Sequence, residues 1–222
     1  MKRSPLLLGF LAAGLVGRLS PQACAQATLT TLFTNGPTAN RINTVVLSEG
    51  YTASQLGQFL IDARGAVSNL LATTPYREYS NYFNAFAISV ASTQSGSDHH
   101  TPTVNLVNTY FNSTYDSYGL QRLLTIPPND WNSTYANGQG KVDALLQSLM
   151  PEYDLVILLV NDSQYGGSGG TTLISSMNSS SPELVRHESG HTFGGLTDEY
   201  TNAYPGYIAA EKPNATAQTS PP

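Results

Sequence analysis

Hydrophobic and polar residues follow one another along this chain with two different spacings, which predict strands and helices in turn. The apolar run at residues 44–48 and the alternating segment at 83–91 are both typical of buried strands. Between them, residues 52–71 carry apolar side chains with the period of an amphipathic helix. A strand, a helix and a strand in this order indicate a βαβ unit within a sheet that is backed by helices.

The second half of the chain continues this alternation. Residues 141–150 have helical spacing and end at Pro151, and the uninterrupted apolar run at 155–160 is typical of a strand buried on both faces. Residues 171–176 predict a further strand. The sequence contains no internal repeat and no clear linker, so we expect one mixed α/β domain over residues 28–222.

Residues 95–128 follow neither spacing. They contain Gly, Pro and an Asn-Ser-Thr cluster, and we therefore expect loops there, with a short helix at 120–124. Within these loops, Asp98-His99-His100 offers ligands for a second ion. No further acidic residue lies close by in the sequence, however, and a surface loop is the simpler interpretation. We expect Trp131 to pack in the core or at its rim.

Residues 187–191 read His-Glu-Ser-Gly-His, the HExxH pattern in which two histidines on one helix face hold a zinc ion. Residues four apart lie above one another on a helix, so both histidines can converge on one ion, with Glu188 beside it as a general base. The pattern also occurs by chance on ordinary exposed helices. Its context favours a metal site, because two of only four histidines fall here and the carboxylates of Asp198 and Glu199 follow within reach.

The helix that carries this pattern has recognisable ends. Its start has two interpretations: a capping box from Ser180 to Glu183, or Ser181 as the N-cap with Pro182 as the first helical residue. Gly194-Gly195 predicts its end, because glycine adopts backbone conformations that other residues resist.

The glycine-rich run at 166–170 matches the G-x-S-x-G pattern of serine hydrolases. That pattern needs a strand leading into a helix and a histidine that comes last in the catalytic order. Here a β-like segment follows and no histidine lies beyond His191, so we exclude this chemistry. We expect instead a flexible or edge-strand rim beside the metal site, where an extended peptide could pair through its backbone.

The composition is more typical of secreted than of cytosolic proteins, and the N-terminal segment points the same way. Charged residues make up only 11% of the sequence, well below the usual quarter of a soluble domain. Residues 1–27 combine a positive start, twelve apolar residues and a small-residue cleavage site, which predicts a signal peptide rather than a membrane anchor. We therefore expect a secreted protein, extracellular or periplasmic.

Removal of this segment takes away three basic residues and changes the net charge from −5 to −8. The only cysteine, Cys24, leaves with it, so packing and a metal must stabilise the mature chain without disulfides. An acidic chain without basic runs argues against nucleic acid and against a stable membrane association. Five N-x-S/T sequons matter only in a glycosylating host, at Asn112, Asn132, Asn161, Asn178 and Asn214.

Five segments together resemble the IgA peptidase family of secreted zinc metallopeptidases, the igalysin branch of the metzincins. They run in family order from about Asn40 to Tyr200, and the last two are the most specific. The segments are Val46-Leu47-Ser48-Glu49-Gly50-Tyr51-Thr52, Tyr82-Phe83-Asn84-Ala85-Phe86, Ser95-Gly96-Ser97-Asp98-His99, Leu159 to Gly167, and His187 to Tyr200.

The resemblance implies a metzincin-like catalytic domain, a mixed α/β fold with a cleft between an upper sheet subdomain and a lower one. It makes His187 and His191 zinc ligands and Glu188 the general base and acid. Asp198 or Glu199 then serves as the third ligand. Most metzincins place that ligand ten residues after the first histidine, which here is Thr197, so the extra glycine favours Asp198.

Metzincins also place a methionine turn beneath the metal, downstream of the helix. The methionines here, Met1, Met150 and Met177, all lie upstream. We therefore expect the C-terminal part of the family fold to be missing, as in a fragment or an early-terminated member of the family.

Two functions follow from the sequence. The first is a secreted zinc-dependent endopeptidase that hydrolyses protein or peptide substrates through a metal-activated water. The alternative is a non-catalytic secreted binding module that contains zinc, or an inactive fragment of such a peptidase. The intact Glu188 favours the first, because a structural zinc ion needs no general base.

Overall fold

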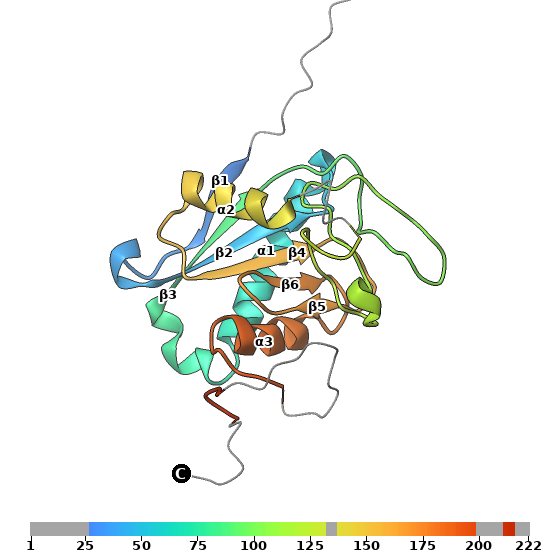
Figure 1. Cartoon of the computed structure of the whole chain (residues 1–222). Coiled ribbons are helices and arrows are strands. Elements are labelled where there is room, and N and C mark those ends of the chain that lie inside the picture. Colours follow the sequence, from blue (N-terminus) through green and yellow to red (C-terminus); the bar gives the residue numbers. More distant parts are fainter. Residues whose placement is uncertain (1–26, 132–136, 199–210, 216–222) are drawn as a thin grey trace, which may run out of the picture.

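A six-stranded sheet forms the centre of the molecule, shown in Figure 1 as a computed structural model that describes residues 27–131, 137–198 and 211–215. The strands are β1 (Thr28–Phe33), β2 (Ile42–Glu49), β3 (Phe83–Ser89), β4 (Leu155–Val160), β5 (Gly167–Ser168) and β6 (Leu173–Ser176). The α-helices are α1 (Leu56–Leu71), α2 (Gly138–Leu149) and α3 (Ser181–Thr192). Short 3-10 turns are η1 (Thr38–Asn40), η2 (Ala53–Gln55), η3 (Tyr76–Tyr82) and η4 (Ser117–Gly119).

The strand order is β1-β3-β2-β4-β6-β5. The four inner strands pair in parallel, and the two edge strands β1 and β5 pair antiparallel to their neighbours. The predicted βαβ unit is therefore present as β2-α1-β3, and all four strands expected from the sequence are confirmed. A mixed α/β fold results, as the hydrophobic spacing indicated.

Both faces of the sheet are covered, which explains why its central strands are apolar throughout. One face packs against α2 through Val142 and Leu146, together with Phe111 and Tyr115 from the long loop region. The opposite face packs against α1 and α3, the latter through Val185 (Figure 1). In the described part of the chain, no helix is long and apolar enough to cross a membrane.

The prediction of a short helix at 120–124 is wrong. Arg122 has a left-handed backbone with φ of 69°, and the segment pairs by β-bridges instead of coiling. Leu124 is fully buried and donates its main-chain N–H to the carbonyl of Gly167 in β5. The apolar residues whose spacing resembled a helical turn instead include Leu124, which is buried where this segment pairs with the distant β5.

Glu49, at the end of β2, holds the long loop region against the sheet. Its carboxylate is fully buried and accepts three hydrogen bonds: from Thr109 Oγ1 at 2.6 Å, Ser113 N at 2.8 Å and Phe111 N at 2.9 Å. Burial raises the pKa of Glu49, and these donated hydrogen bonds act in the opposite direction. One carboxylate thus fixes residues about sixty positions downstream.

We expect Glu49→Gln to lower the free energy of unfolding by about 1–3 kcal/mol, because a buried donor loses its acceptor. The main-chain N–H groups of Phe111 and Ser113 face different carboxylate oxygens, so either orientation of the amide leaves one of them opposite an NH2 group. Urea unfolding followed by circular dichroism measures this. The matched control is Glu152→Gln, which changes an exposed carboxylate; equal stability of the two variants would contradict the assigned role.

Candidate metal centre

Helix α3 carries the HExxH residues and begins at Ser181, with Ser180 in the N-cap position. Neither side-chain cap expected from the sequence is formed, since Ser180 makes no capping hydrogen bond and Ser181 Oγ donates to the carbonyl of Ser176. Pro182 lies in the first turn as expected. The preceding Asn178 fixes the start of the helix instead, by accepting a hydrogen bond from Ser180 N at 3.0 Å.

A left-handed turn ends the helix and returns the chain toward the histidines. Gly195 has φ of 64°, and the N–H of Leu196 donates to the carbonyl of Gly190 at 3.0 Å. This confirms the glycine end predicted from the sequence. His191 Nδ1 lies 2.9 Å from the carbonyl oxygen of Leu196. Because a carbonyl only accepts, Nδ1 carries the proton and Nε2 keeps a lone pair for a ligand.

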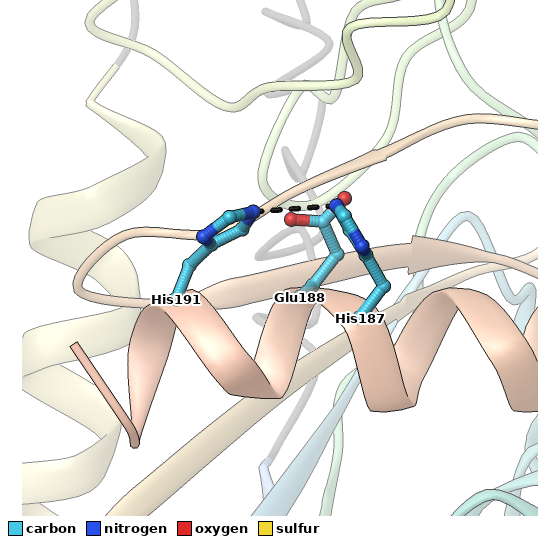
Figure 2. A group of neighbouring side chains, drawn as sticks. All are labelled: His187, Glu188 and His191. Atoms are coloured by element: carbon cyan, nitrogen blue, oxygen red, sulfur yellow. Dashed lines mark hydrogen bonds between the residues drawn. The ribbon is translucent and has the colours of Figure 1, made fainter. Parts of the chain in front are cut away.

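Three donor atoms converge beside α3. His187 Nε2 and His191 Nε2 are 3.3 Å apart (Figure 2), and Asp198 Oδ1 lies 3.2 Å from the first and 3.3 Å from the second. Bonds of about 2.0–2.1 Å in a tetrahedral zinc site place its ligand atoms about 3.3–3.4 Å apart. The separations and the donor types, two imidazole nitrogens and one carboxylate oxygen, both fit such an ion.

Glu188 lies between the two histidines (Figure 2), and only 7% of it is exposed. Burial raises the pKa of Glu188 to about 7, and the nearby Asp198 carboxylate adds to this effect. His191 and a hydrogen bond from the main chain of Gly169 lower the pKa in part. A carboxyl group with a pKa near neutrality can both accept and release a proton, as a general base and acid must.

A cavity of ≈ 470 Å³ opens on the donor atoms. Besides the two histidines and Asp198, its lining includes Leu196, Thr197 and Asn214. His187 is about half exposed, whereas His191 and Asp198 are about a quarter exposed. The donor atoms can therefore be reached from solvent.

The glycine-rich run forms β5 at the sheet edge and then turns over α3. The edge-strand interpretation is confirmed, but the edge is not open as expected, because Gly167 already pairs with residues 122–124. Gly169 comes so close to α3 that an added Cβ would lie 2.5 Å from His191 Cβ and 3.2 Å from Glu188 Oε2. Sequence reasoning noticed the glycines but missed this contact.

The Asp98-His99-His100 cluster does not belong to the group at residues 187–191. His99 Nε2 lies 2.8 Å from Asp162 Oδ2, an acid that is distant in sequence, and Asp98 is buried rather than on the surface. The His100 ring stacks on Trp131, which is 42% exposed and thus packs at the rim. Among the described residues, groups with metal-ligand spacing occur only around His187 and His191, where Glu188 or Asp198 completes the set.

Several sequence predictions lie outside the described residues. They concern the signal peptide at 1–27 apart from its last residue, Glu199 and Tyr200, Asn132, and the C-terminal residues 201–210 and 216–222.

The IgA Peptidase M64 family model matches residues 30–221. The chain belongs to this family. The match covers far more than half of the sequence and confirms the resemblance inferred from the five segments. A comparison with individual curated proteins found no match. Membership in the IgA Peptidase M64 family associates the chain with peptide-bond hydrolysis, and the converging donor atoms lie within the matched region.

If the centre holds a metal ion, we expect Gly169→Ala to weaken its binding by about 10–100-fold, the usual effect of disturbing residues that support a metal ligand. The added Cβ overlaps His191, so the helix or the turn must move. Titration against a chromophoric chelator measures the affinity. Gly65→Ala in α1 is the control, because its added Cβ meets no atom within 4 Å; equal affinities of the two variants would show that the close approach is unimportant.

Proposed function

We propose that this chain is a secreted zinc-dependent endopeptidase, with His187, His191 and Asp198 as metal ligands and Glu188 as the general base and acid. The observation that carries the proposal is the triangle of donor atoms, 3.2–3.3 Å on each side, next to a buried carboxyl group. Membership in a peptidase family supports it. Secretion rests on the sequence of residues 1–27.

A metzincin-like arrangement belongs to the same proposal. It is supported by a parallel sheet with an antiparallel edge strand, β5, followed by β6 and then by the helix that carries the histidines. Protein or peptide is the substrate class, because the family is one of peptidases. The family description alone does not select immunoglobulin A among such substrates.

A bound zinc ion would supply Lewis-acid activation of water and of the scissile carbonyl group. The residues of the chain supply orientation and proton transfer. The carboxylate of Glu188 accepts a proton from the attacking water and then donates it to the amide nitrogen that leaves. Glu188 ends each turnover as the carboxylate with which it began, and its low exposure shields it from bulk water.

We expect Glu188→Gln to bind zinc as the unchanged chain does and to lose about 10²–10⁴-fold in kcat, because the ligands remain and the base does not. A labelled-peptide digest, with and without chelator, measures activity, and metal analysis measures zinc. Glu183→Gln changes an exposed carboxylate on the same helix and should leave both unchanged. Equal cleavage by the Glu188→Gln and unchanged chains would overturn the mechanism, and zinc binding without cleavage by either would favour the binding module.

The third ligand is tested by comparing Asp198→Ala with Glu199→Ala. We expect the greater loss of bound zinc from Asp198→Ala, since Asp198 Oδ1 lies beside both imidazole nitrogens. Metal analysis after dialysis against dilute chelator measures the difference. A greater loss from Glu199→Ala would transfer the ligand role to that residue.

A further inference from the structure

The side chain of Asn214 forms hydrogen bonds with the main chain of Thr197, the residue that precedes the proposed ligand Asp198. Its Oδ1 accepts a hydrogen bond from Thr197 N at 3.0 Å, and its Nδ2 donates one to the carbonyl of Thr197 at 2.8 Å. A primary amide can satisfy both main-chain groups of one residue in this way, as a neighbouring strand would. Asn214 also lines the cavity beside the donor atoms.

The turn that contains Asn214 holds the amide in position. Lys212 N donates to the carbonyl of Ala215 at 2.9 Å, and Ala215 N donates back to the carbonyl of Lys212 at 3.2 Å. Asn214 therefore belongs to a small paired turn rather than to an extended strand. A side chain carried by such a turn loses little additional freedom when it binds Thr197.

Asp198 is thus held from two directions. On the helix side, Leu196 donates its N–H to Gly190 and its carbonyl oxygen faces His191 Nδ1. On the other side, Asn214 fixes Thr197, whose carbonyl belongs to the same peptide plane as the Asp198 N–H. Fixing this plane limits where the Asp198 carboxylate can point, and its Oδ1 lies within 3.3 Å of both imidazole nitrogens.

From these contacts we infer that Asn214 is a positioning residue of the metal centre, which holds Asp198 in ligand geometry without touching the metal. The inference rests on the proposed function. It differs from a merely structural role, in which the same two hydrogen bonds would only attach residues 211–215 to the rest of the molecule. The two roles make different predictions for metal affinity.

We expect Asn214→Ala to weaken zinc binding by about 10–100-fold, as loss of a partner that orients a ligand usually does, and to lower kcat more than it changes KM. Competition with a chromophoric chelator measures affinity in the full chain without substrate. Asn214→Leu keeps the side-chain volume and replaces the alanine variant if that fails to fold.

Asn35→Ala is the matched control. Its amide also makes two main-chain contacts, to the carbonyl oxygens of Phe83 at 2.9 Å and Ser80 at 3.2 Å, but it contacts no residue next to a proposed ligand. We expect a comparable loss of stability from both alanine variants and a loss of zinc affinity only from Asn214→Ala. Equal zinc affinities of the two variants would overturn the positioning role.

A double-mutant cycle tests the route of the effect. Because Asn214 acts through Asp198, Asn214→Ala should leave zinc affinity unchanged when Asp198→Ala is already present. An additive loss in the double variant would show that Asn214 acts by another route and would overturn the inference. Failure of the unchanged chain to bind zinc would instead overturn the proposed function, so the two failures can be told apart.

Discussion

The close packing of α3 against the β5–β6 edge of the sheet is the constraint on which the candidate metal centre depends. Leu184 and Val185 anchor the helix, and Gly167 and Gly169 leave no side chain between helix and strand. A Cβ at Gly167 would lie 3.0 Å from Leu184 Cδ1. Because β5 and the following turn lie this close to α3, the main chain of Gly169 reaches the carboxyl group of Glu188. The packing of helix against strand therefore sets both the position of α3 and the surroundings of Glu188.

Three donor atoms this close together need a proton or a cation among them. Two imidazole lone pairs and a carboxylate oxygen at 3.2–3.3 Å repel one another unless protons or a cation intervene. A divalent cation satisfies all three at once, and its binding must displace any protons held there. Helix α3 on one side and the Asn214 turn on the other hold the three groups in place.

Sequence patterns predicted the elements whose signal is local. Residues 155–160 are apolar throughout because both faces of β4 are covered, and α3 was identified from residues four apart and from Gly195 at its end. Contacts between distant residues left no such signal. Three contacts depend only on where the folded chain places distant residues. They are the pairing of Leu123 with Gly167, the close approach of Gly169 to His191, and the hydrogen bonds of Asn214 to Thr197.

Three of the sequon asparagines have amide groups that the fold already uses. The Nδ2 atoms of Asn161, Asn178 and Asn214 donate hydrogen bonds to main-chain carbonyl oxygens, and an N-linked sugar attaches to that same nitrogen. A eukaryotic secretory host adds such sugars before the chain has folded, so a glycan at Asn214 would compete with the contact to Thr197. The choice of expression host therefore decides whether the Asn214 amide is free to bind Thr197. Protein from a host without this modification keeps the amide group that the fold uses.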